Sequence, residues 1–145
     1  MLVNQILSMK QSGEIFTVAP DATVAEAAKL LSEKRIGAIV VSEDGRKPVG
    51  ILSERDIVRE LGRRGAAVLT ASISELMTRK LATCHTGEDT LAILDRMTQG
   101  RFRHLPVVDA EGNMLGIVSI GDAVSGRLKE LAAEKEALTG MIMGN

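Results

Sequence analysis

An internal repeat constrains the fold of this chain more than any other feature of its sequence. With a shift of 67 positions, Thr23 matches Thr90, Ala25 matches Ala92, and Val40-Val41 matches Val107-Val108. After one apparent extra residue near Lys47 the shift becomes 66, and the matches continue at Gly50-Ile51, Ser53, Asp56 and Val58, which pair with Gly116-Ile117, Ser119, Asp122 and Val124. The sequence therefore predicts two copies of one folding unit, divided into residues 1–72 and 73–145. Because a unit of about 60 residues buries little surface alone, the copies are expected to pack together across a pseudo-twofold axis.

Each copy is predicted to contain a helix, a strand, a tight turn, a second strand and a second helix, which makes the fold class α/β (α+β) with a small sheet in each repeat. Thr23 and Glu26 have the spacing of a capping box at the start of the first helix, and Thr90 is the corresponding cap in the second copy. Residues 36–41 form a continuous apolar run of strand length. The expected hairpin turns and second strands are residues 43–46 and 110–113, and residues 49–52 and 115–118.

Two further segments have amphipathic patterns. Residues 3–8 align with residues 73–78 at a shift of 70, and each segment is expected to pack on the opposite repeat. The tail from residue 122 to residue 143 predicts one long C-terminal helix. Its apolar side chains gather near one side, which indicates a partner helix: Val124, Leu128, Leu131, Leu138 and Met141.

Composition excludes several classes of function. The chain of 145 residues carries 18 basic and 19 acidic side chains, so neither nucleic acid nor a membrane surface is favoured as a partner. It has no Trp, no Tyr and two Phe, which leaves almost no platform for stacking bases. Cys84 is the single cysteine, so no intrachain disulfide can form and a reducing, cytoplasmic location is predicted. His85 follows it, but adjacent strand residues point to opposite faces, so no metal site is expected.

The motif Gly-h-h-Ser-x-x-Asp (h is apolar) occurs once in each repeat, at Gly50–Asp56 and at Gly116–Asp122. One interpretation is a variant of the capping box, in which the serine and the aspartate only begin the next helix. The other is a binding corner, where free helix N–H groups receive a phosphate and the aspartate accepts hydrogen bonds from ribose hydroxyls. The residues alone do not separate the two. No nucleophile, base and orienting group recur at a plausible spacing, so an enzyme is not expected.

With these corners the chain resembles the CBS-domain family, named after cystathionine β-synthase, in the tandem arrangement also seen in inosine monophosphate dehydrogenase and the γ subunit of AMP-activated kinase. The resemblance runs from Val3 to about Leu131 and is strongest at the two corners, the Thr-capped helices and the segment 103–108. It implies that clefts between the repeats bind an adenosine-containing ligand such as AMP, ADP, ATP or NAD(H), sometimes S-adenosylmethionine, and report energy or redox state.

Residue by residue, the resemblance places ribose-binding carboxylates at Asp56 and Asp122 and phosphate-proximal hydroxyls at Ser53 and Ser119. Arg55 and Arg103, with Arg101, could supply charge to phosphate. The other implied site residues are two segments that line adenine and two threonines at the extended edge: Gly37, Ala38, Ile39, His104, Leu105, Pro106, Thr17 and Thr83. Purely structural roles stay open for Pro106, which can shape an edge strand, and for His104. Both corners carry Ser where Thr is common in the family, and Ile120-Gly121 lacks the charge of Glu54-Arg55, so the two sites are expected to differ.

The function expected from this resemblance is a nucleotide-sensing regulatory module without a catalytic cofactor. Because the two repeats account for the chain, its output would pass through a regulated partner protein or through its own oligomer. The family resemblance and the apolar tail both favour a homodimer. The alternative is a structural or partner-binding adaptor whose clefts are closed by side chains.

Overall fold

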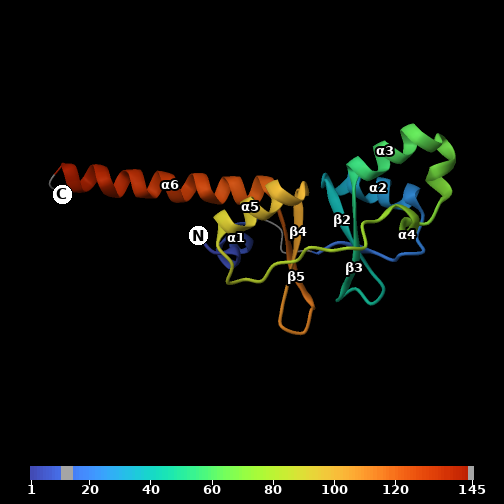
Figure 1. Ribbon diagram of the computed structural model, residues 1–145, viewed down its shortest axis with the longest axis horizontal. Helices are drawn as coiled ribbons and strands as arrows, with labels where there is room; N and C mark the ends of the chain where they lie inside the picture. Colours follow the sequence, from blue (N-terminus) through green and yellow to red (C-terminus); the bar gives the residue numbers. More distant parts are fainter. Residues whose placement is uncertain (11–14, 144–145) are drawn as a thin grey trace.

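Two small sheets, each covered by helices, lie side by side, and one long helix extends from the second of them (Figure 1). This computed structural model describes residues 1–10 and 15–143. The first sheet and the helices beside it are β1 (Thr17–Val18), α2 (Val24–Lys34), β2 (Ala38–Ser42), β3 (Pro48–Ser53), α3 (Glu54–Arg64), a 3-10 helix (Ala66–Thr70) and α4 (Ile73–Leu76). The other elements are α1 (Val3–Met9), α5 (Thr90–Gly100), β4 (His104–Val108), β5 (Met114–Ser119) and α6 (Ile120–Ile142). The predicted mixed α/β architecture with its long C-terminal helix is confirmed.

The strands of the two repeats follow the same plan. In the first sheet β2 runs antiparallel to β3 and parallel to the short strand β1. In the second sheet β4 runs antiparallel to β5, and a single parallel bridge between Cys84 and Val107 stands where β1 stands in the first. Gly45 and Gly112 in the two hairpin turns have φ angles of 76° and 85°, which a residue without a Cβ adopts at no cost.

Strand register shows that a shift of 66 relates the strands of the two repeats. Ala38 lies opposite Ser53 in the first sheet, and His104 lies opposite Ser119 in the second, so equivalent strand positions differ by 66. Helices α2 and α5 begin at residues 24 and 90, and the residues that cap their C-terminal ends, Arg35 and Arg101, both have left-handed φ. The predicted shift of 67 for the helix and the first strand was therefore wrong by one residue, because the identities of Thr23 with Thr90 and of Ala25 with Ala92 do not mark equivalent positions in the two helices.

The start of α5 is corrected for the same reason. Its cap is Asp89, whose carboxylate accepts a hydrogen bond from the N–H of Leu91 at 2.9 Å. Thr90, the predicted cap, is the first helical residue; it is buried, and its hydroxyl donates to the carbonyl of Met1 at 2.7 Å. At α2 the predicted capping box is confirmed, since the N–H of Glu26 donates to Thr23 Oγ1 and the N–H of Thr23 donates to Glu26 Oε2.

The short helices α1 and α4 stand ahead of the two repeats, and we call them the lead-in helices. Each completes the core of the opposite repeat, as the amphipathic patterns predict. Val3 and Ile6 of α1 are buried in the second core, among residues such as Ile93 and Leu105. Ile73 and Leu76 of α4 are buried in the first core, among residues such as Ile39 and Leu52. Matching hydrogen bonds hold the two helices: the N–H of Val3 donates to Glu88 and the N–H of Ile73 donates to Ala22. The cores therefore cross the predicted division at residues 72 and 73.

The glycine that begins each corner motif makes room for these lead-in segments. A Cβ on Gly50 would lie 2.5 Å from Met77 Sδ and 3.2 Å from the carbonyl of Thr78, and a Cβ on Gly116 would lie 2.8 Å from Leu7 Cδ2. A side chain at either position would push the opposite lead-in segment away from the strand. In the described part of the chain, no helix combines the length and the apolar character that crossing a membrane requires.

Candidate ligand clefts between the repeats

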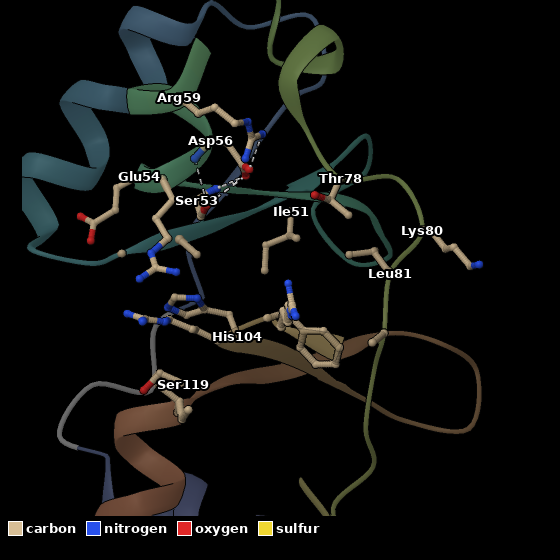
Figure 2. Close-up of a pocket in the computed structure, with 18 residues that line it drawn as sticks. Ile51, Ser53, Glu54, Asp56, Arg59, Thr78, Lys80, Leu81, His104 and Ser119 are labelled. Carbon is tan, nitrogen blue, oxygen red and sulfur yellow. Dashed lines mark hydrogen bonds and ion pairs between the residues drawn. The ribbon is translucent and has the colours of Figure 1, made fainter. Parts of the chain in front are cut away.

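Two cavities of similar size open between the repeats. Cleft 1, of about 490 Å³, is bounded by the first corner, the segment after α4, and residues 101–104. Figure 2 shows Ser53, Asp56 and Arg59 along one wall, with His104 and Ser119 across the space. Cleft 2, of about 470 Å³, is bounded by the second corner, the end of α1, and residues 35–38. Each cleft thus combines the corner of one repeat with the segment after the lead-in helix that packs on that repeat.

The first corner is a closed hydrogen-bonded unit. Ser53 caps α3, because its Oγ accepts from the N–H of Asp56 at 3.2 Å. Asp56 Oδ2 in turn accepts from the N–H of Ser53 at 2.9 Å and from its hydroxyl at 3.0 Å. Asp56 Oδ1 accepts from Arg59 Nη2 at 3.0 Å, an ion pair within one turn of the helix. Asp56 is consequently buried yet charge-compensated at the wall of cleft 1.

The second corner has the same capping box but a different counter-ion. Ser119 Oγ accepts from the N–H of Asp122 at 3.0 Å, and Asp122 Oδ2 accepts from the N–H of Ser119 at 2.9 Å. Lys10, which follows α1, places its ammonium 2.9 Å from the same oxygen and donates to the carbonyl of Ile117 at 2.7 Å. Burial alone would raise the pKa of Asp122, but the Ser119 N–H and the Lys10 ammonium outweigh burial and lower the pKa below its usual value.

Both aspartates therefore cap their own helices, as the first interpretation of the motif predicts, and both also line a cleft. The two interpretations do not exclude each other. An ionised carboxylate offers about four acceptor positions. Asp56 uses three of them, for two bonds from Ser53 and one from Arg59, whereas Asp122 uses two. Binding of a ribose diol through Asp56 would require Arg59 to turn aside, whereas both contacts of Asp122 fall on Oδ2 and leave Oδ1 without a hydrogen-bond partner among the described residues.

Charge distinguishes the two clefts. Five basic side chains line cleft 1: Arg55, Arg59, Lys80, Arg101 and Arg103. The acidic side chains there are Glu54 and Asp56. Cleft 2 is lined by Lys10 and Arg35 on the basic side and by Asp122 on the acidic side. A low-dielectric cavity with an excess of positive charge attracts anions, so cleft 1 is the stronger candidate for a phosphate-bearing ligand.

Sequence reasoning found some of these residues and missed others. Of the predicted residues, Gly37, Ala38, Ser53, Arg55, Asp56, Arg103, His104 and Ser119 line cleft 1, and Asp122 lines cleft 2. Arg59, Lys80, Lys10 and Arg35 were not predicted. A signal for two of them was present, because extending the alignment of residues 3–8 with 73–78 by two positions pairs Lys10 with Lys80.

The other five predicted residues lie away from the cavity walls. Ile39 and Leu105 are fully buried in the first and second cores, so their side chains serve packing. Pro106 is buried in β4, and its carbonyl accepts from the N–H of Cys84. Thr17 is paired in β1, and the carbonyl of Thr83 accepts from Arg96 at 2.6 Å.

His104 stands between the two clefts. It lines both cavities, as do Gly37, Ala38 and Ser119. Its ring lies over Gly37, where a Cβ would be 3.5 Å from His104 Cε1. Burial lowers the pKa of His104; nearby Asp122 and Glu54 act in the opposite direction, and Lys10 and Arg103 add to the lowering.

We expect the free energy of unfolding to decrease as the pH falls below about 6.5, the value of an unperturbed histidine. In that range the unfolded chain binds a proton that folded His104 does not bind, so stability present above pH 6.5 is lost as the pH falls through the lower folded pKa. Urea unfolding at pH 7.5 and at pH 5.5 measures the difference. His104→Gln should reduce it, and His85→Gln, at an exposed position, should leave it unchanged. A difference that His104→Gln does not alter would contradict the prediction.

The described residues give little support for a reactive cysteine or a metal site, and Cys84 lines neither cleft. Burial raises the pKa of Cys84 to about 12, so its thiol is protonated at neutral pH and is a poor nucleophile. Within residues 1–10 and 15–143, no group of three His, Cys, Asp or Glu side chains is arranged to hold a metal ion.

The fold and the paired clefts define a class of tandem-repeat module, and comparison with known proteins identifies it. The family model described as CBS domain matches residues 3–63 and 73–128, so the chain belongs to the CBS-domain family. The chain is similar to the CBS-domain containing protein ATU1752 from Agrobacterium tumefaciens, with 39% identity, a TM-score of 0.81, and coverage of 87% of this chain and 92% of that one.

Two other similar structures contain adenosine ligands. The CBS domain pair of protein MJ0100, in complex with 5′-methylthioadenosine and S-adenosyl-L-methionine, has 28% identity and a TM-score of 0.75, covering 93% of this chain and 98% of that one. The protein CBSX2, in complex with AMP, has 26% identity and a TM-score of 0.73, covering 88% of this chain and 96% of that one.

Proposed function

We propose that this protein is a regulatory module that binds an adenosine-containing ligand in the clefts between its repeats. The observation that carries the proposal is the composition of cleft 1, where a carboxylate at a helix start, a serine hydroxyl and five basic side chains surround one cavity of about 490 Å³. A carboxylate suits a ribose diol, and the cations suit phosphate. Similar CBS pairs crystallised with AMP, or with S-adenosyl-L-methionine and 5′-methylthioadenosine, support the adenosine part.

The remainder of cleft 1 suits a base. Ile51, Leu81 and Ala38 give part of the wall of cleft 1 an aliphatic character, and Phe102 adds an aromatic ring. An adenine would bury its faces there, while its sugar and phosphate extend toward Asp56 and Arg55. The excess of cations favours AMP, ADP, ATP or NAD(H) over S-adenosylmethionine, which carries a positive charge on sulfur. Cleft 2, with fewer cations, would bind such ligands more weakly or bind a different one.

The module acts without catalysis in this proposal, and its output passes to a regulated partner or to its own oligomer. We place it in the cytoplasm, since a single buried cysteine suits a reducing compartment. The second candidate is an adaptor that needs no ligand. The closed hydrogen bonding of Ser53, Asp56 and Arg59 favours it, because all three side chains have partners within the protein.

Thermal and chemical unfolding with a panel of ligands tests the proposal. A ligand that binds the folded protein at one site should stabilise it by about 2.7 kcal/mol at 100 times its dissociation constant. The panel is AMP, ADP, ATP, NAD⁺, NADH, S-adenosylmethionine, 5′-methylthioadenosine and adenosine, with GMP as the control for the base. We expect AMP to stabilise the fold more than adenosine at equal concentration. No stabilisation by any member at millimolar concentration would favour the adaptor.

A further inference from the structure

Helix α6 carries hydrophobic side chains at the spacing of a two-stranded coiled coil. Its positions 121, 124, 128, 131, 135, 138 and 142 follow one another at alternating intervals of three and four residues, and we call them the α6 seam. Six of the seven are Gly121, Val124, Leu128, Leu131, Leu138 and Ile142, and the seventh is Lys135. Leu128 is 61% exposed, Leu138 59% and Ile142 84%. Such a seam normally faces a partner helix.

The seam points away from the body of the protein. Ala123 and Gly126, on the other side of α6, are buried, and a Cβ on Gly126 would lie 2.9 Å from Met1 Sδ and 3.3 Å from Ile6 Cγ1. Residues 131–139 are all exposed, and Figure 1 shows this part of α6 projecting beyond the sheets. Because isolated helical segments of about a dozen residues are marginal in water, the projecting half of α6 gains stability only when its seam is covered.

We propose that a second copy of this chain covers the seam, with the two α6 helices antiparallel. Lys135 decides the direction. In a parallel pair the two Lys135 ammonium groups would share one layer of the interface, where like charges repel. In an antiparallel pair each Lys135 would lie beside Val124 of the other copy, and its long stem can cover that side chain while the ammonium reaches water.

Charges beside the seam also select one antiparallel register. Arg127 and Glu134 flank the seam on the same side, one heptad apart; within its own helix Arg127 pairs with Glu130 and lies 3.8 Å from Glu134, so a pair with the second copy would share these contacts. When Leu128 lies opposite Leu131 of the second copy, Arg127 faces Glu134 of that copy, and symmetry makes a second identical pair. Sliding by one heptad in either direction would place Glu134 against Glu134 or Arg127 against Arg127, and both arrangements are repulsive.

The same register also fits the shapes of the side chains. It places Leu138 opposite Gly121 of the second copy, and Gly121 is exposed and has no side chain to obstruct the leucine. The seam positions from 121 to 138 then form six consecutive layers, each with a partner. The proposed dimer needs no ligand, so it stands independently of the function proposed for the clefts.

Sedimentation equilibrium of the full chain tests the interface. We expect a particle with about twice the 15.5 kDa mass of the chain. Leu131→Asp should give a monomer, since it buries a charge in the central layers. Ala133→Asp changes the opposite side of the same turn and should leave the dimer intact. Far-ultraviolet circular dichroism and thermal unfolding confirm that both variants are folded. A monomeric wild type, or a dimer that survives Leu131→Asp, would overturn the proposal.

Two further sets of variants test direction and register. Arg127→Glu or Glu134→Arg alone should raise the dimer dissociation constant about tenfold, and the double variant should restore it to within about threefold of the wild type. For direction, Val124→Cys and Lys135→Cys should form a disulfide only when the two variants are mixed. Antiparallel helices hold the two copies of residue 124 about 16 Å apart along the axis, beyond disulfide reach. Crosslinking within either single variant, or no restoration by the double charge reversal, would contradict the proposed arrangement.

Discussion

Replacing Ile73 by alanine is expected to lower the free energy of unfolding by about 2–5 kcal/mol and to loosen the first repeat, although Ile73 follows that repeat in the sequence. Its side chain is fully buried in the first core, where it packs with residues such as Ile39 and Leu52. Removing the three outer carbons of the isoleucine leaves a cavity that the surrounding strands can close only in part. The loss should appear in denaturant unfolding as a lower midpoint.

Native-state hydrogen exchange locates the damage. With Ile73→Ala, amide protons of β2 and β3 should exchange faster than those of β4 and β5. The matched variant Ile6→Ala removes a buried isoleucine from the second core and should reverse this pattern. Leu115→Ala, at a position that is 47% exposed, is the control and should have little effect. Faster exchange in β4 and β5 after Ile73→Ala would show that each lead-in helix stays with its own repeat.

Replacing Asp56 by alanine is expected to weaken binding of an adenosine ligand in cleft 1 by about 1.5–3 kcal/mol, roughly ten- to a hundredfold. Each hydrogen bond from a ribose hydroxyl to an ionised carboxylate contributes about 1.5–3 kcal/mol, and the proposal assigns two of them to Asp56, one of which replaces the bond from Arg59. Isothermal titration with AMP measures the loss. Asp56→Asn keeps the shape and the capping acceptor but removes the charge, so its effect on affinity should be intermediate.

A control is needed because Asp56 also belongs to a capping box. Glu26 occupies the equivalent place in the box that begins α2, and it does not line either cleft. Loss of the capping bond should lower the free energy of unfolding by about 0.5–2 kcal/mol in Asp56→Ala and in Glu26→Ala alike. Only Asp56→Ala should change the affinity for AMP. The wild type should bind 2′-deoxy-AMP more weakly than AMP, whereas Asp56→Ala should not distinguish the two. Equal affinity of the wild type for both ligands would remove the ribose role while leaving a binding function intact.

The sequence predicted the elements of the fold because their signals are local and occur twice. The short apolar strands, the glycine turns and the Thr23–Glu26 cap each depend on a few neighbouring residues, and the structure contains them. The amphipathic patterns of residues 3–8 and 73–78 also led to the expectation that α1 and α4 each pack on the opposite repeat, as they do. The errors were at Thr90 and in the register of the helix, where identical residues stand at positions that are not equivalent in the structure.

The candidate site was predicted less completely because its charges come from segments that are distant in sequence. Lys10 reaches Asp122 across 112 positions, and the repeat gives no reason to prefer that pairing over the one that Arg59 makes within α3. Ile39 and Leu105 illustrate a different limit of sequence reasoning. The family resemblance predicts that their strand segments line adenine, but alternate strand residues face opposite sides, and the side chains of these two face the cores.

The position of His104 between the two cavities affects how a ligand titration of this protein is interpreted. Its imidazole, together with Gly37, Ala38 and Ser119, forms a thin partition with a cavity on either side. A molecule in one cavity that pushes the ring toward the other cavity narrows that second cavity, and a molecule that holds the ring in place fixes the shape of both. If ligands occupy both cavities, as we propose, binding in one would change the affinity of the other, and the shape of the binding isotherm would report this coupling.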